Sequence, residues 1–210
     1  MPNFQLGPAV RSRLGRFEIP AADRYRSLFI NLEDCAEVIS SVAPAARILE
    51  VGCGDGTMAQ RLLDRYPEAE YVGIDVAPNP GRLFRGDRSQ VSFRSIDSTE
   101  FLATESQRFD LVVVVDVMHH VPLDLRDKLM LDVQELTTPG GRYMIKEWDP
   151  IPGPSHWACW SADRFISGDR IKHMPMTQMK SWLAGLLGDE LVLEARIPPH
   201  RHNYLLAYAR

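Results

Sequence analysis

Cysteine is scarce in this sequence, basic residues are not in excess, and long apolar runs are missing. Its three cysteines, Cys35, Cys53 and Cys159, are an odd number without a CxxC pair, which gives no sign of a disulfide framework or a zinc site. The formal net charge of −4 argues against a protein that binds nucleic acid by neutralising its phosphates. We therefore predict no bound metal ion and no nucleic-acid partner.

The beginning of the chain has no apolar stretch of the kind that a secretory signal needs. The longest strongly apolar run, at residues 111–115, is far shorter than the roughly 20 residues of a membrane-spanning helix. We therefore expect no membrane partner and, with so few cysteines, a cytoplasmic location. The sequence does not indicate an oligomeric state.

Arginines gather at two places, and each cluster leaves two interpretations open. The clusters comprise Arg11, Arg13 and Arg16, and Arg82, Arg85 and Arg88. Scattered arginines usually cover a solvated surface. The alternative is a site for an anionic substrate.

A chain of 210 residues, 45% of them hydrophobic, is enough for one domain with a sizeable core. Short β-branched runs alternate with amphipathic helical stretches, a pattern that predicts a parallel sheet with crossover helices. The five predicted strands of this part cover residues 47–51, 71–75, 91–95, 109–116 and 142–146. The fourth is the most hydrophobic, so we place it centrally in the sheet.

Helical spacing of apolar residues predicts helices over residues 34–42 and 57–66, and another that contains Leu125, Leu129, Val133 and Leu136. The sequence Pro139-Gly-Gly141 predicts a turn before the fifth strand.

The last two apolar runs, residues 191–197 and 203–209, are joined by only residues 198–202. A parallel crossover needs a dozen or more residues, so these two strands should be antiparallel neighbours. Two regions lie outside the alternation: residues 1–45 and residues 148–175. The second region holds Trp148, Trp157 and Trp160, which either anchor a capping helix or contact a ligand.

Three glycines, Gly52, Gly54 and Gly56, lie between the first predicted strand and the helix after it. Glycine tolerates a positive φ and lets the backbone approach a ligand, and the helix start offers N–H donors. A dinucleotide site is the competing interpretation, but its pattern is G-x-G-x-x-G, whereas this loop reads G-x-G-x-G and continues with Thr57.

Acidic residues follow the next three strands. Asp75 ends the second strand, Asp97 with Ser98 follows the third, and Asp116 ends the fourth. Asp75 is spaced from the glycine loop so that its carboxylate can accept hydrogen bonds from ribose hydroxyls. Open α/β sheets bind ligands along the carboxyl ends of their strands, so these residues should converge on one ligand.

These segments together resemble class I S-adenosylmethionine (SAM) dependent methyltransferases. The similar segments are LEVGCGDG, YVGIDVAP, SFRSIDSTEF, FDLVVVVDVMHHV and LTTPGGRYMIKEWD, from about residue 47 to residue 147. The DVMHHV stretch is similar to small-molecule methyltransferases in particular. The resemblance implies an α/β, Rossmann-like three-layer sandwich with a seven-stranded, mostly parallel sheet and an antiparallel C-terminal hairpin.

The resemblance also implies how SAM, or its product S-adenosyl-L-homocysteine, would be held. Glu50 would brace the loop and help hold the methionine amino group, and Gly52, Gly54 and Gly56 would pack against the methionine tail and ribose. Asp75 would bind the ribose diol. The remaining contacts would come from Val76 on the adenine face, Asp97 and Ser98 beside adenine, and Asp116 and Val117 beside the methionine part.

Three residues near the expected methyl group are candidates for catalysis. His119 and His120 follow the fourth strand and Glu147 ends the fifth, and any of them could act as the general base. The histidine pair could equally cap the strand end or pack against the next helix. We expect His200 and His202, between the last two strands, to be exposed turn residues.

The chain is expected to form one domain over residues 1–210. Residues 46–147 would bind SAM, residues 1–45 and 148–175 would form an N-terminal helical lid and a substrate lid, and residues 176–210 would supply the last helix and hairpin. The expected function is methyl transfer to a small molecule, such as a secondary metabolite.

Two alternatives remain. One is a nucleic-acid methyltransferase, although this chain has Asp116-Val-Met-His119 in place of an N/D-P-P-Y/F motif. The other is a SAM- or nucleotide-binding protein without methyl transfer, or an NAD-linked oxidoreductase.

Overall fold

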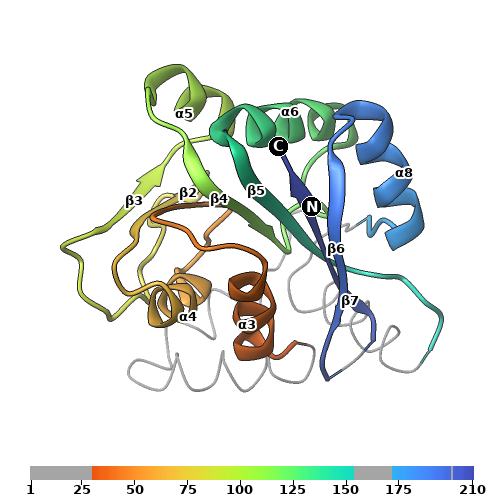
Figure 1. Ribbon diagram of the computed structural model, residues 1–210, viewed down its shortest axis with the longest axis horizontal. Helices are drawn as coiled ribbons and strands as arrows, with labels where there is room; N and C mark the ends of the chain where they lie inside the picture. The colour runs from red at the N-terminus through yellow and green to blue at the C-terminus, as the bar shows by residue number, and fades with distance from the viewer. Residues whose placement is uncertain (1–29, 154–171, 200) are drawn as a thin grey trace, which may run out of the picture.

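A seven-stranded mixed sheet forms the centre of the computed structural model, which describes residues 30–153, 172–199 and 201–210. The strands are β1 (Arg47–Val51), β2 (Glu70–Asp75), β3 (Val91–Ser95), β4 (Phe109–Val115), β5 (Thr137–Trp148), β6 (Glu190–Ile197) and β7 (Asn203–Ala209). Their order is β3-β2-β1-β4-β5-β7-β6, with β1 to β5 parallel and β7 antiparallel to both β5 and β6 (Figure 1). The predicted fold class, the central position of β4 and the terminal hairpin are confirmed.

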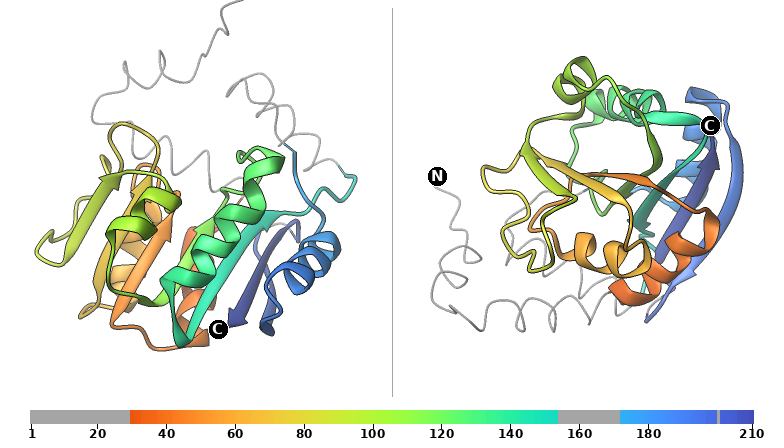
Figure 2. Two further views of the ribbon diagram at one scale, coloured as in Figure 1. Left: turned by 90° about the horizontal axis from the view of Figure 1, so that it is seen from above. Right: turned by 60° about the vertical axis from the view of Figure 1, so that its left-hand side comes forward.

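Helices cover both faces of this sheet, as Figures 1 and 2 show. One face carries α3 (Leu32–Val42) and α4 (Thr57–Arg65). The other carries α5 (Ser98–Thr104), α6 (Arg126–Leu136) and α8 (Met176–Leu186), with the short 3-10 helix η2 (Leu123–Leu125) before α6. The sandwich therefore has the three expected layers.

Successive side chains of a strand point to opposite faces of the sheet, so they pack against the helices on alternate sides. In β1, Leu49 and Val51 pack in the core on the α5–α6 side, whereas Ile48 packs on the α3–α4 side. Val112 and Val114 of β4 alternate with its other buried residues in the same way. Both faces of the central strands are buried, which explains their continuous apolar sequence.

Strand β5 differs from the sequence prediction. It already begins at Thr137, and the predicted turn at Pro139-Gly-Gly141 is an irregularity inside the strand. The pairing with β4 shifts there, from Thr137 beside Phe109 to Arg142 beside Leu111. Because residues on both sides of the glycines pair with β4, the segment is part of the strand and not a turn that precedes it. Leu125, expected in a helix, lies in η2 and is half exposed.

The tryptophan and histidine predictions are resolved only in part. Trp148 is buried at the end of β5, and its ring stacks on His202 with 4.8 Å between centroids. His202 lies in a turn, as predicted, but it is only partly exposed, because its ring stacks on that of Trp148. The predictions that lie outside the described residues concern Arg11, Arg13, Arg16, Trp157, Cys159, Trp160, His200, and most of residues 1–45 and 148–175.

The two described cysteines, Cys35 and Cys53, are free and buried. In the described parts of the chain, no helix has the length and apolar character needed to cross a membrane.

Candidate functional site

The glycine loop after β1 turns sharply beside the ends of β2 and β4. Gly52 N and Cys53 N both donate to the Ile74 carbonyl, at 2.8 and 3.0 Å. Gly52 has a φ of +76°, and a Cβ there would overlap the Val117 Cγ2 methyl. Only glycine fits this position, because both the backbone conformation and the space forbid a side chain.

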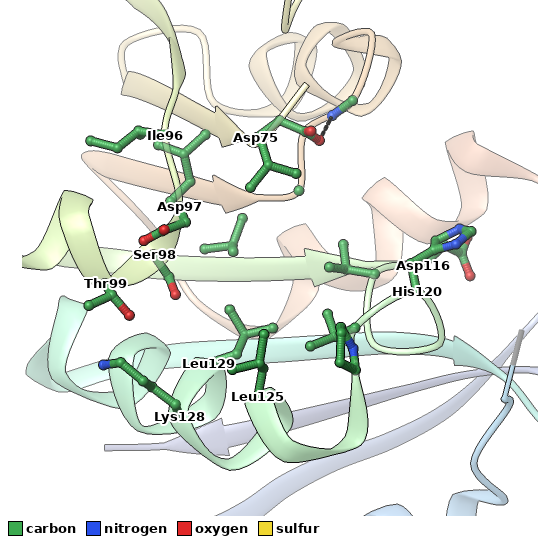
Figure 3. Close-up of a pocket in the computed structure, with 18 residues that line it drawn as sticks. Asp75, Ile96, Asp97, Ser98, Thr99, Asp116, His120, Leu125, Lys128 and Leu129 are labelled. Atoms are coloured by element: carbon green, nitrogen blue, oxygen red, sulfur yellow. Dashed lines mark hydrogen bonds between the residues drawn. The ribbon is translucent and has the colours of Figure 1, made fainter. Parts of the chain in front are cut away.

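A cavity of about 890 Å³ opens at the carboxyl ends of β1, β2 and β4 (Figure 3). The cofactor residues predicted from sequence that line it are Gly52, Gly54, Asp75, Val76, Asp97, Ser98, Asp116 and Val117. Apolar side chains from the β4–α6 connection, among them Val121, Leu125 and Leu129, close another side. The acidic strand ends therefore converge on one cavity, as the topology of a parallel sheet requires.

Asp75 is held firmly at the wall of this cavity. Its two carboxylate oxygens accept hydrogen bonds from Gly54 N and from Ala77 N, each at 2.8 Å. A carboxylate oxygen has a second lone pair, so Asp75 can still accept bonds from a diol. The next residue, Val76, is 79% exposed within the cavity lining and offers an apolar surface to a planar ring.

Asp97 and Ser98 also have local structural roles. Asp97 caps α5 by accepting a bond from Glu100 N at 2.8 Å. The hydroxyls of Ser98 and Thr99 both donate to Asp132 Oδ2 at 2.8 Å. Sequence reasoning missed the buried Asp132, because nothing in the pattern of α6 distinguishes it from a surface residue.

A second cavity of about 440 Å³ lies on the α3–α4 side of the glycine loop. It shares Gly52, Gly54 and Asp116 with the first cavity, and Glu50 lines it. Gly56 lines neither cavity; a Cβ there would come within 2.9 Å of the Gly81 Cα, so its role is close packing of two loops.

Glu50 is a buried carboxyl group, only 2% exposed, that accepts a hydrogen bond from the Tyr71 hydroxyl. Burial raises its pKa to about 8, and the nearby Asp55 and Asp75 charges add to this against the opposing Tyr71 bond. Near neutral pH, Glu50 therefore holds a proton in the folded protein. A cation placed in the second cavity would favour its ionised form.

Asp116 forms an ion pair with a lysine that is almost completely buried. Lys146 Nζ lies 2.7 Å from both carboxylate oxygens, and Lys146 is 2% exposed. The Asp116 backbone has a φ of +56°, and its N–H donates to the Lys146 carbonyl at 2.9 Å. This pairing, which sequence reasoning missed, fixes Asp116 where the two cavities meet.

The three residues predicted for catalysis lie together at the ends of β4 and β5. His119 Nδ1 is 2.6 Å from Glu147 Oε2, and Met118 N donates to the other Glu147 oxygen at 2.7 Å. The His120 ring lies 4.2 Å from the His119 ring, and His120 alone of the three lines the larger cavity. The His173 ring also lies close, 5.0 Å from the His119 ring.

Burial of His119 opposes its protonation, but the adjacent Glu147 carboxylate outweighs burial and raises the His119 pKa above its ordinary value. The Glu147 pKa is lowered correspondingly, because the charges of His119 and Lys146 overcome the cost of burial. Each partner of the pair therefore stabilises the charged form of the other.

Comparison with known proteins gives a consistent result. The model of a family described as methyltransferase domain matches residues 49–143. A ubiquinone biosynthesis O-methyltransferase from Acinetobacter baumannii is 25% identical over 163 residues, which are 75% of this chain and 55% of that protein. A 2-heptyl-1-hydroxyquinolin-4(1H)-one methyltransferase from Mycobacteroides abscessus is 27% identical over 112 residues, 51% of this chain and 48% of that one.

A solved structure has a similar fold. The 1,6-didemethyltoxoflavin-N1-methyltransferase of Burkholderia thailandensis, crystallised with 1,6-didemethyltoxoflavin and S-adenosylhomocysteine, has a TM-score of 0.65 at 17% identity. The similarity covers 95% of this chain and 86% of that one. The chain spans about half, or less, of the length of the curated relatives that it matches. Residues 49–143 are therefore similar to a methyltransferase domain, and the strand order and overall fold agree with those of a solved methyltransferase.

Proposed function

We propose that the protein transfers a methyl group from SAM to an ionisable group, such as an acidic hydroxyl, on a small molecule. The observation that carries this proposal is the convergence of the glycine loop with Asp75, Asp97 and Asp116 on one cavity. The relatives named above as methyltransferases act on small molecules, which supports the same substrate class.

The chemistry of the lining fits SAM in one orientation. The adenosine would occupy the larger cavity, with its ribose diol at Asp75 and its adenine ring against Val76. The methionine part would cross the shared glycines into the second cavity and bring its ammonium group near Glu50. The raised pKa of Glu50 supports this placement, because no cation among the described residues is paired with this buried acid, and an ammonium group would stabilise its ionised form.

When bound, SAM supplies a methyl group that its positively charged sulfur activates. The chain's own task is to position the acceptor and to manage its proton. We assign the proton acceptor to an imidazole nitrogen of His120, which lines the cavity. The neighbouring His119, oriented by Glu147, would hold the His120 ring in position, because the two rings pack 4.2 Å apart.

We propose further that residues 1–210 form one domain with residues 46–147 as the SAM-binding core. Residues 1–45 and 148–175 would then shape the acceptor site, and the contact of His173 with His119 supports this for the second segment. The free thiols of Cys35 and Cys53 support a cytoplasmic location, and the net charge of −4 supports a protein that does not act on nucleic acid.

Calorimetry and a methylation screen together test the proposal. SAM and S-adenosylhomocysteine should bind the wild type, and Asp75→Ala should weaken both, whereas the exposed Asp64→Ala serves as the control. A mass-shift screen against small hydroxylated acceptors should then reveal a product. Failure of the wild type to bind either compound would refute the proposed function.

The histidine assignment needs a separate measurement. His120→Ala should slow methyl transfer more than it weakens SAM binding, with His202→Ala as a control outside both cavities. Unchanged turnover in His120→Ala would remove His120 from the mechanism.

A further inference from the structure

Lys146 is a charged residue inside an otherwise apolar part of the sheet. It is 2% exposed, and Met144, two residues earlier on the same face of β5, packs in the core on the α3–α4 side. A buried ammonium group is tolerated only when it is paired, because it gives up its hydration. The Lys146 Nζ lies 2.7 Å from both carboxylate oxygens of Asp116, and this contact supplies the pairing.

Asp116 brings this ion pair to the lining of both cavities. Gly52, Gly54 and Asp116 are the described residues that line both of them, and Asp116 is the charged one among the three. Its side chain is 34% exposed, and the residue follows the end of β4 (Figure 3). Lys146 lines neither cavity, so it acts on a ligand only through its charge and through Asp116.

The proposed orientation of SAM brings its sulfur to the place where the two cavities meet. The sulfur joins the adenosine, assigned to the larger cavity, to the methionine part, assigned to the second. It is positively charged in SAM and uncharged in S-adenosylhomocysteine, because the charge is lost with the methyl group. A carboxylate without a counterion at this place would therefore favour SAM over its product, and the Lys146 charge reduces that preference.

We infer from this arrangement that Lys146 balances the charge of Asp116 beside the cofactor's sulfur and so sets the relative affinity of the site for SAM and S-adenosylhomocysteine. The inference rests on the proposed function and deepens it, since it names a residue that controls how reactant and product compete. Interactions that hold the reactant more tightly than the transition state slow a reaction, and the sulfur loses charge as the methyl group leaves. An unpaired Asp116 carboxylate would be such an interaction, and the ion pair weakens it.

Isothermal calorimetry of SAM and S-adenosylhomocysteine, without an acceptor, tests this inference on the whole chain. The ratio of the two dissociation constants isolates the charge of the sulfur, because both ligands share the adenosine, the ammonium group and the carboxylate. Lys146→Met should shift this ratio roughly three- to tenfold toward tighter binding of SAM. Asp116→Asn leaves the Lys146 charge uncompensated and should shift the ratio in the opposite direction. The double variant should return it to within about twofold of the wild type.

Lys180→Met is the matched control, because Lys180 forms an ion pair with Glu194 at 2.6 Å and lines neither cavity. It should leave the ratio unchanged. An unchanged ratio in either single variant of the Lys146–Asp116 pair, or shifts of both in the same direction, would overturn the inference. If urea denaturation shows that one of the two does not fold, the other decides alone. If the wild type binds neither ligand, the proposed function itself fails.

Discussion

Glu50 makes the stability of this protein depend on pH in a direction opposite to that of most carboxylates. The unfolded chain ionises this group near 4.5, whereas the folded protein retains its proton up to a pKa of about 8. Between these values the folded state binds one more proton than the unfolded state, so raising the pH favours unfolding. Glu50→Gln keeps an acceptor for the Tyr71 hydroxyl and removes the titration.

The magnitude follows from the pKa difference. Each pH unit in this interval should lower the free energy of unfolding by about 1.4 kcal/mol through Glu50 alone. Between pH 5 and pH 7 the contribution amounts to about 3 kcal/mol, an upper estimate that other titrating groups will alter. The variant should therefore match the wild type near pH 5 and exceed it in stability near pH 8.

Urea denaturation of the wild type and Glu50→Gln from pH 5 to pH 8 measures this difference. Glu37→Gln, an exposed position on α3, is the control and should follow the wild type. Calorimetry in buffers of different ionisation enthalpy adds a second readout: S-adenosylhomocysteine should release roughly one proton on binding near pH 7, because its ammonium group favours ionised Glu50. Parallel pH–stability curves for wild type and Glu50→Gln would refute the reasoning.

Four further predictions concern the glycine loop and the histidine site. Gly52→Ala should lower the free energy of unfolding by about 2–4 kcal/mol, because its positive φ and lack of space both oppose a Cβ. Position 54 has open space around it, so Gly54→Ala should lower the free energy of unfolding by only about 1–2 kcal/mol. Because Gly54 lines the cavity, the same change should strongly weaken S-adenosylhomocysteine binding. Denaturation and calorimetry on both glycine variants measure these two effects. Glu147→Gln should lower the His119 pKa, because burial is then opposed only by the Asp116 charge, and an NMR titration would show this. The potential metal-ligand atoms of His119, Glu147 and His173 lie within 4.8 Å of one another, but His119 and Glu147 already bond to each other. Turnover should therefore survive millimolar EDTA. A loss of activity that added zinc restores would contradict this prediction.

The parts of the fold that sequence could predict depend on short-range patterns. The apolar run of β4 identified a strand buried on both faces, and the short link before β7 required an antiparallel hairpin. The amino-acid sequence was enough to bring Asp75, Asp97 and Asp116 to one cavity, because parallel strands present their carboxyl ends at one edge.

Predictions from short sequence patterns were wrong where contacts between residues far apart in the chain determined the local structure. The glycines at 140 and 141 predicted a turn before the strand, but β5 already begins at Thr137, and the pairing of Thr137 and Arg142 with β4 places the glycines in an irregular part of it. His202 lies in a turn that was predicted to be exposed, and stacking on Trp148 covers part of it. In both cases the partner is far away in sequence, so no local pattern records the contact.

The sequence by itself determined the order of strands and helices and the glycine bend that a cofactor needs. Only the tertiary structure decided the chemical state of the site: it buried Glu50 beside Tyr71, paired Asp116 with Lys146, and joined His119 to Glu147. The physical reason is that a pKa depends on burial and on neighbouring charges, and folding supplies both from residues far apart in the chain.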